Sequence, residues 1–260
     1  PGGDRDVLLP LRPGGAGAPV FCVHPAAGLG WSFAGLARYL DAGHPLYALQ
    51  SPGLEGGPDH LPATVADTAA AYVARIREVA PRGPYHLVGW SAGGLIAHEM
   101  AVLLQAAGEQ VGLLAVLDGY PLAGLPPVAA PSPEEVAEAV RRETAGLHLD
   151  ARIRDNLAAV YLGLARAARE FTPGVFHGEL LHFAAAHDRD QDRLDAELWR
   201  PHVDGPLRRH DVACGHEEMT RPQALGVIGP ALSDRLRDIT GTTDITDITA
   251  SGQDTEGTRS

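Results

Sequence analysis

Short apolar runs alternate with longer segments of helical spacing along most of this chain. Most of the runs are continuous, which is typical of strands that are buried on both faces of a sheet. They are predicted at residues 20–23, 46–49, 84–89, 111–117, 179–184 and 207–213. Helices are predicted in the periodic segments between them, and this order of elements indicates an α/β fold with a mostly parallel, doubly wound sheet.

Capping and stop residues mark the ends of several predicted helices. Residues 64–80 carry apolar side chains at helical spacing, and Thr64 with Asp67 is placed to form a capping box at their start. The helix that follows the 84–89 strand is closed by Gly108. Because ligands bind at the carboxyl ends of the strands in sheets of this kind, the loops after the strands are the first place to search for a site.

Residues 121–131 interrupt the alternation with proline and alanine. Helical spacing then returns near residues 134–144 and 153–170, before the sheet resumes. An insertion directly after a strand end would cover a site at that end of the sheet. We therefore expect a mobile helical lid at about residues 121–175.

The two ends of the chain differ in composition from the part between them. Residues 1–18 are rich in proline, glycine and arginine, which suits a linker or an edge segment better than a core element. A closing helix is expected at residues 222–238, and the polar residues 241–260 are typical of a disordered tail. We therefore expect one α/β domain over residues 19–240.

Composition limits the classes of partner. A chain of 260 residues with 45% hydrophobic content can form one large domain with a buried core. Its net charge of −12 argues against nucleic acid, because phosphate backbones need a cationic face. With no apolar run of about 18 residues and no signal-peptide pattern, we expect no membrane span and a cytoplasmic location. The spacing of Cys22 and Cys214 indicates neither a disulfide framework nor a metal site.

Residues 87–94, Leu-Val-Gly-Trp-Ser-Ala-Gly-Gly, have the pattern of a nucleophile elbow. In such a turn a strand passes sharply into a helix and holds a serine, here Ser91, at the apex in a strained conformation. Gly89 and Gly93 lie where a Cβ atom would collide with the neighbouring strand and helix. Since glycine is frequent in this chain, the motif gains its weight from the strand sequence before it and the helix sequence after it. Together they predict a serine acyl-transfer enzyme.

A serine hydroxyl needs a base to take its proton and an acid to orient that base. Among the twelve histidines, His216 is the strongest candidate because it lies between the last predicted strand and the last helix. Two aspartates could serve as the acid. Asp118 ends the 111–117 strand without a loop, whereas Asp188 follows the next strand in a charged stretch. We favour Asp118 because its carboxylate would be held rigidly near the serine, and Asp188 stays open as the alternative.

The tetrahedral intermediate of acyl transfer needs two backbone N–H donors. Ala92, the residue after the serine, would supply one from the start of a helix, and Ala26 in the loop after the first core strand is our choice for the other. Trp90, beside the serine, could line the wall of the substrate pocket, and packing in the core or the elbow is an equal alternative. The sequence indicates no metal site, and we expect no cofactor bound by the domain itself.

Four separated motifs together resemble the thioesterase domains that end nonribosomal peptide synthetases. They are Val-Phe-Cys-Val-His-Pro-Ala-Ala-Gly at 20–28, Gly-Pro-Tyr-His-Leu-Val-Gly-Trp-Ser-Ala-Gly-Gly at 83–94, Leu117-Asp118 and Gly215-His216. The resemblance covers about residues 5–238 and implies an α/β-hydrolase fold. It also implies that Ser91 is the nucleophile, that His216 is base and then acid, and that Asp118 orients the imidazole. The segment Leu-Leu-Pro-Leu at 8–11 looks like the joint that follows a peptidyl-carrier domain.

The resemblance further implies a substrate and a partner. A peptidyl or depsipeptidyl chain would pass from the 4′-phosphopantetheine thiol of the carrier domain to the serine. It would leave as a free acid or, after attack by its own amine or hydroxyl, as a macrocycle, in some family members after several copies have been joined. Two other functions stay open on the sequence. One is a stand-alone editing thioesterase or small-ester carboxylesterase that uses the same residues, and the other is a catalytically silent fold used as a binding module.

Overall fold

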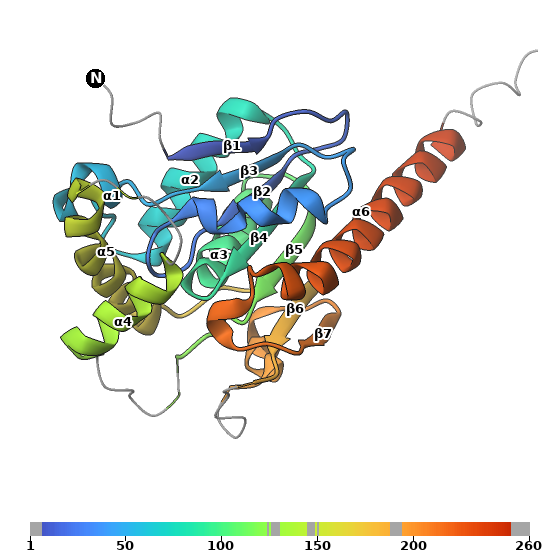
Figure 1. Ribbon diagram of the computed structural model, residues 1–260. Coiled ribbons are helices and arrows are strands. Elements are labelled where there is room, and N and C mark those ends of the chain that lie inside the picture. Colours follow the sequence, from blue (N-terminus) through green and yellow to red (C-terminus); the bar gives the residue numbers. More distant parts are fainter. Residues whose placement is uncertain are drawn as a thin grey trace, which may run out of the picture.

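The computed structural model describes residues 7–123, 125, 131–144, 149, 151–187 and 194–241, together with the backbone of residues 242–250. One seven-stranded sheet forms the centre of the molecule, with helices on both of its faces (Figure 1). Its strands are β1 (Leu8–Arg12), β2 (Val20–Val23), β3 (Leu46–Leu49), β4 (Tyr85–Trp90), β5 (Val111–Leu117), β6 (Leu180–Ala185) and β7 (Leu207–Val212).

The strands lie in the order β1-β3-β2-β4-β5-β6-β7. All neighbouring strands are parallel except β1, which pairs antiparallel with β3 at the edge of the sheet. The register of β4 and β5 places Trp90 opposite Leu117, so the residues that follow these two strands start from the same edge. This mostly parallel sheet with helices on both faces confirms the predicted α/β fold class.

The helices connect these strands. They are α1 (Gly53–Gly56), α2 (Val65–Val79), α3 (Ala92–Ala106), α4 (Pro133–Glu143), α5 (Ala151–Glu170) and α6 (Pro222–Ala250), with 3-10 segments η1 (Gly30–Arg38), η2 (Pro58–His60), η3 (Ala196–His202) and η4 (His216–Glu218). At the start of α2, Thr64 Oγ1 accepts a hydrogen bond from the N–H of Asp67 at 3.0 Å and donates one to its carboxylate at 2.7 Å. This pairing is the N-terminal cap that the two residues predict.

Two apolar clusters cover the two faces of the sheet. The first joins the sheet to α2, α3 and α5, and the second joins it to η1 and α6. Side chains of β4 alternate between them, since Leu87 belongs to the first cluster whereas Val88 and Trp90 belong to the second. The helices α3 and α5 therefore lie on one face of the sheet, and α6 lies on the other (Figure 1).

The insertion between β5 and β6 contains the two helices expected for the lid, α4 and α5. A capping box starts α4: Ser132 Oγ accepts from the N–H of Glu135 at 3.2 Å, and Glu135 Oε2 accepts from the N–H of Ser132 at 2.6 Å. The helix α5 buries Leu157, Val160 and Leu164 in the first apolar cluster. It therefore anchors the insertion to the domain, whereas α4 is the more polar of the two helices.

Both ends of the described chain extend the regular structure beyond what the sequence predicts. Of the two interpretations offered for residues 1–18, a linker or an edge segment, residues 8–12 follow the second, because they form the edge strand β1. The helix α6 includes residues 241–250, which the sequence assigns to a tail, because lengthening a formed helix adds a hydrogen bond per residue without a new nucleus. The rest of the expected tail, 251–260, lies outside the described residues.

Candidate active site

Ser91 lies between the end of β4 and the first residue of α3, at the apex of a sharp turn. Its backbone has φ 56° and ψ −124°, a conformation that residues with a side chain rarely adopt. A Cβ atom at Gly89 would lie 2.1 Å from the carbonyl oxygen of Gly93, and one at Gly93 would lie 2.3 Å from that of His24. The N–H of Ser91 donates to the carbonyl of Leu117 at 2.9 Å. The turn therefore has the geometry of a nucleophile elbow.

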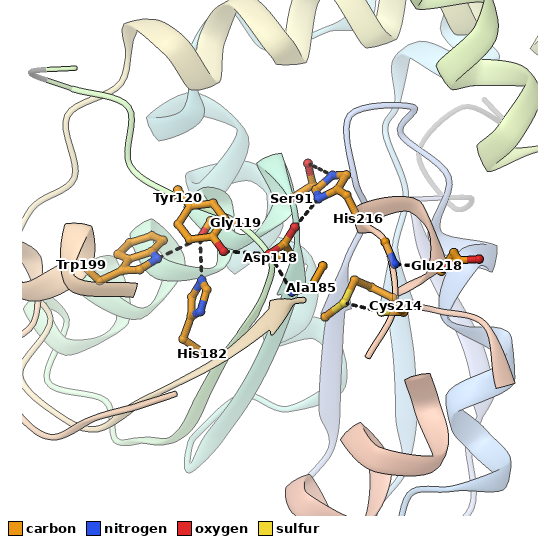
Figure 2. A network of polar contacts seen from close by, with 12 residues as sticks. Ser91, Asp118, Gly119, Tyr120, His182, Ala185, Trp199, Cys214, His216 and Glu218 are labelled. Carbon is orange, nitrogen blue, oxygen red and sulfur yellow. Dashed lines mark hydrogen bonds and ion pairs between the residues drawn. The ribbon is translucent and has the colours of Figure 1, made fainter. Parts of the chain in front are cut away.

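His216 lies between Ser91 and Asp118 (Figure 2). Its Nε2 is 3.1 Å from Ser91 Oγ, and its Nδ1 is 2.7 Å from Asp118 Oδ2. An imidazole in this position can take a hydroxyl proton at Nε2 while a carboxylate keeps Nδ1 protonated. The structure thus brings together the serine, histidine and aspartate that the sequence singles out.

Asp118 is fixed by more than its contact with His216. Its Oδ1 accepts hydrogen bonds from the N–H of Ala185 at 2.9 Å and from the hydroxyl of Tyr120 at 2.8 Å. Burial opposes ionisation of this carboxyl, but the hydrogen bond and charge of His216 together with the other two donors outweigh it, so the pKa of Asp118 is lowered. The carboxylate therefore stays ionised at neutral pH. The alternative acid, Asp188, lies outside the described residues.

The residues that support this aspartate are not singled out by any clear sequence pattern. Tyr120 follows it closely in Leu-Asp-Gly-Tyr, a weak signal that a hydroxyl could fold back onto the carboxylate. Ala185 contributes only its backbone N–H, so no side-chain pattern could identify it. The carbonyl of Gly119 accepts hydrogen bonds from Trp199 Nε1 at 2.9 Å and His182 Nε2 at 3.1 Å (Figure 2). These contacts fix the loop that leaves β5.

A cavity of about 750 Å³ opens over Ser91. Ala26 and Ala92, the two expected oxyanion-hole donors, both line it. Ala92 is the first residue of α3, where backbone N–H groups have no partner within the helix. The loop that carries Ala26 is held by His24, whose ring nitrogens lie 2.5 Å from the hydroxyl of Tyr72 and 2.7 Å from the carbonyl oxygen of Pro25.

The lid forms another wall of this cavity. Lid residues that line it include Leu122, Ala139, Arg142, Tyr161, Ala168 and Arg169. The wall is therefore largely apolar, with one phenol, two guanidinium groups and the carboxylate of Glu135. A volume of this size is in the range of pockets that bury a drug-sized ligand.

Trp90 is not among the residues that line the cavity, which favours the alternative of packing in the core. Its side chain is buried in the second apolar cluster, on the face of the sheet away from α5. Successive side chains of a strand point to opposite faces, and Trp90 points in the same direction as Val88. Its ring lies 6.0 Å from that of His216. Trp90 therefore packs beside the imidazole and forms no part of the cavity wall.

Other chemistry near the site is limited. Cys214 lies two residues before His216 and is a buried free thiol, as is Cys22. Burial raises the pKa of Cys214 to about 11, so the thiol stays protonated and is a poor nucleophile at neutral pH. Among the described residues, no group of three or more His, Cys, Asp or Glu side chains could hold a metal ion. No helix in the described part of the chain has the length and apolar character of a membrane span.

The chain is similar to parts of much longer proteins. The model of the thioesterase domain family matches residues 18–231. A dimodular nonribosomal peptide synthase of Bacillus subtilis is 36% identical over 90% of this chain, which corresponds to 11% of that protein. A probable non-canonical nonribosomal peptide synthetase of Salinispora arenicola is 38% identical over 91% of this chain and 3% of that protein. The chain thus spans about a tenth or less of the length of these relatives.

Solved structures show the same fold. The NocB thioesterase domain, in a covalent complex with a fluorophosphonate nocardicin G analogue, matches with a TM-score of 0.68 and 27% identity, over 90% of this chain and 99% of that one. The Vlm2 thioesterase domain with a bound dodecadepsipeptide matches with a TM-score of 0.69 at 19% identity, over 88% of this chain and 97% of that one. Because the family model covers most of the sequence and the fold agrees with it, the chain belongs to the thioesterase domain family.

Proposed function

We propose that this domain releases a peptidyl or depsipeptidyl chain from the 4′-phosphopantetheine arm of a carrier domain, through an acyl-enzyme on Ser91. The observation that carries the proposal is the 3.1 Å contact between His216 Nε2 and Ser91 Oγ, at the base of a cavity roofed by the lid. Membership of the thioesterase family supports the thioester as the scissile bond. Similarity to parts of nonribosomal peptide synthetases supports the peptidyl chain and the carrier partner.

In the proposed acylation, His216 Nε2 takes the proton of Ser91 as Oγ attacks the thioester carbonyl. The carbonyl oxygen becomes negative and is stabilised by the N–H groups of Ala26 and Ala92. The tetrahedral intermediate then collapses, the carbon–sulfur bond breaks, and the imidazolium returns its proton to the departing pantetheine sulfur. Throughout, the ionised Asp118 keeps Nδ1 protonated and stabilises the imidazolium.

The ester on Ser91 is then resolved by a second nucleophile. His216 takes a proton from water or from an amine or hydroxyl of the bound chain as that group attacks the ester carbonyl. The second tetrahedral intermediate then collapses, the bond to Ser91 Oγ breaks, and His216 gives the proton to Oγ. Attack by water gives a free acid, whereas attack by the chain itself gives a macrolactam or macrolactone. A cavity of about 750 Å³ leaves room for a folded chain, and exclusion of water by the lid would favour the intramolecular reaction. The domain itself needs no cofactor for either outcome.

The proposed partner is a peptidyl-carrier domain of the same synthetase. The domain carries a net charge of −12. A carrier domain that is itself acidic would gain nothing from long-range attraction, so we expect it to dock through apolar contacts and local arginines. We propose a cytoplasmic location for such an assembly.

Intact-mass spectrometry tests the proposal. Wild type and Ser91→Ala are incubated with peptidyl thioesters that carry an internal amine or hydroxyl, and both adducts and products are identified. We expect an acyl adduct on the wild type, none on Ser91→Ala, and a cyclic product or a free acid from the adduct. Ser32→Ala is the matched control, because Ser32 lies in η1 and its hydroxyl only donates to the carbonyl of Leu29.

Two other outcomes contradict the proposal in different ways. Rapid turnover of short acyl esters, without an adduct from any peptidyl thioester, would indicate a small-ester carboxylesterase that uses the same residues. Failure of Ser91 to react with peptidyl thioesters, short esters and a fluorophosphonate alike would indicate a catalytically silent fold.

A further inference from the structure

The last turn of the lid helix α4 carries two consecutive charged residues that reach the catalytic loops. The first of them, Arg142, has its Nε 2.6 Å from Glu217 Oε2. Glu217 directly follows His216 in the chain, so this ion pair joins the lid to the loop that carries the proposed base. Both members of the pair line the cavity. The pair therefore lies at the boundary between the lid and the substrate space.

The second residue, Glu143, reaches the other catalytic loop. The backbone N–H of Ala27, the residue that follows Ala26, lies near its carboxylate and favours the ionised form, which lowers the pKa of Glu143 against the larger effect of burial. Its Oε2 is buried and has no hydrogen-bond partner among the described residues. A buried carboxyl oxygen without a partner costs free energy. Placing this side chain against the oxyanion loop is therefore unfavourable for the stability of the fold, and it does not help to form α4.

Neither residue is needed to start the helix, and the contact of Arg142 within α4 is the longer of its two, since its Nε lies 3.8 Å from Glu138 Oε1 and 2.6 Å from Glu217 Oε2. The N-terminus of α4 is already satisfied by the capping box of Ser132 and Glu135. Arg141, the residue before the pair, makes its ion pair within α4, to Glu138. Arg142 and Glu143 thus differ from Arg141 in that they also reach the loops that carry His216 and Ala26.

We propose that Arg142 and Glu143 are positioning residues, through which the lid aligns His216 and the oxyanion loop so that Ser91 is fully reactive only when α4 is docked. The proposal rests on the proposed function and assigns a further role within the same site. General-base catalysis and oxyanion stabilisation both depend on geometry within a fraction of an ångström. A lid that sets this geometry makes the serine less reactive whenever the lid is displaced and water can enter.

The test compares two reactions of the same serine. A small fluorophosphonate reacts with Ser91 as the Oγ–phosphorus bond forms and fluoride leaves, and this reaction needs no peptide binding. A peptidyl thioester reports the proposed function. We would measure the rate constant of phosphonylation by intact mass, and kcat and KM for the thioester, in Arg142→Gln, Glu217→Gln and the double variant.

A positioning role predicts a specific pattern in these variants. Each single variant is expected to lower the phosphonylation rate and kcat by up to about tenfold, the scale of one partly exposed charged contact. The double variant is expected to be no slower than either single one, because both changes remove the same contact. Arg141→Gln is the matched control and is expected to leave both rates unchanged within about twofold. Thermal unfolding of each variant identifies any loss of fold.

Two variants of the buried carboxyl test the second contact. Glu143→Gln retains an oxygen that accepts from the N–H of Ala27 and is expected to keep most of the phosphonylation rate. Glu143→Ala removes that acceptor and is expected to lower the rate by up to about tenfold. A purely structural role would lower the unfolding temperature of both variants without separating their rates.

Three results separate this proposal from the proposed function. If the variants change KM for the thioester while phosphonylation is unaffected, these residues only shape the substrate space and the proposal is overturned. Additive losses in the double variant overturn it as well. If the variants slow phosphonylation of Ser91 but no peptidyl thioester is turned over by the wild type, the positioning role stands and the proposed function fails.

Discussion

The catalytic platform and the lid helix α4 face the same cavity but are held by different kinds of contact. By the catalytic platform we mean Ser91, Asp118 and His216 with the strand ends and loop that carry them. Within it, the side chain of Asp118 is 5% exposed and accepts three hydrogen bonds. In α4, by contrast, the side chains of Arg141 and Arg142 are 71% and 54% exposed. Exposed ion pairs contribute about 0–1 kcal/mol each, whereas buried polar networks fix a single arrangement.

This difference assigns separate tasks to the two regions. The backbone sets the platform, because the N–H of Ser91 donates to Leu117 and the N–H of Asp118 donates to Phe183 at 2.7 Å. The backbone that carries Ser91 and Asp118 is thus fixed before any substrate arrives, and in our proposal the lid completes only the alignment of His216 and the oxyanion loop. The exposed ion pairs of α4 are individually weak, so we expect this helix to move more readily than the platform when a large chain enters. In the proposed function the platform would determine the reaction, and the lid would determine when it proceeds and on which chain.

Asp118→Asn is expected to break the platform with the largest effect. The amide NH₂ facing Nδ1 of His216 favours the tautomer with its proton on Nε2, which cannot accept the proton of Ser91. The corresponding change in a serine protease lowers kcat about 10⁴-fold, and we expect a loss of that order in the acylation rate. Single-turnover acylation by a peptidyl thioester measures it.

Asp204→Asn provides the matched control for this change. Asp204 is exposed and its carboxylate contacts His177 at the surface, 2.5 Å away, so its loss is expected to leave acylation unchanged. If Asp118→Asn were acylated normally and Asp188→Ala were inactive, Asp188 and not Asp118 would be the acid that orients His216.

Gly93→Ala is expected to break the platform through the backbone. The added Cβ would lie 2.3 Å from the carbonyl oxygen of His24 and 2.4 Å from that of Val23, so strand or helix must shift. Overpacking of this kind costs about 3 kcal/mol. Urea unfolding should show this loss, whereas Gly14→Ala, whose Cβ meets nothing within 4 Å, should change stability by less than about 0.5 kcal/mol. Equal stability of the two variants would show that the elbow can relax around a methyl group.

Much of the platform could be predicted from the sequence because its requirements are local. The elbow needs Gly89 and Gly93 at fixed distances from Ser91, and a strand before it and a helix after it are visible as apolar patterns. Asp118 directly follows a predicted strand and His216 lies in the loop after the last one, so both are candidates for the same edge of the sheet. These features depend on backbone geometry, which short sequence patterns encode well.

The remaining features depend on contacts between distant segments. The N–H of Ala185 reaches Asp118 only because β6 pairs beside β5, and no side chain marks it. The sequence left two positions open for Trp90, because its direction depends on the strand face to which the last residue of β4 belongs. The pairing of Arg142 with Glu217 depends on how the lid lies over the platform, which neither segment specifies alone.

Docking of α4 is expected to weaken as the pH rises towards neutrality, the smallest of these effects. Burial, with a smaller contribution from the charge of Glu217, raises the pKa of Glu143 to about 7. His216 and the N–H of Ala27 act in the opposite direction. The phenol of Tyr161 also faces this group. A carboxyl whose pKa is higher in the docked lid binds a proton more tightly there, so protonation favours docking. Docking should therefore weaken from about pH 4.5, the ordinary pKa of this carboxyl, up to about pH 7, its raised pKa. Above that pH it should change no further.

Hydrogen–deuterium exchange of α4 measures this change, with labelling times corrected for the intrinsic rate at each pH. From about pH 6 to about pH 7, above the isoelectric point of about 5.4, exchange should rise by about tenfold at most, because water screens a lid contact at the surface. Exchange should then level off by about pH 8, beyond the pKa of Glu143. Glu143→Gln should remove the dependence, whereas Glu138→Gln on the exposed side of α4 should retain it. A dependence that persists in Glu143→Gln would belong to other groups, His216 among them, and would show that the buried carboxyl does not control docking of the lid.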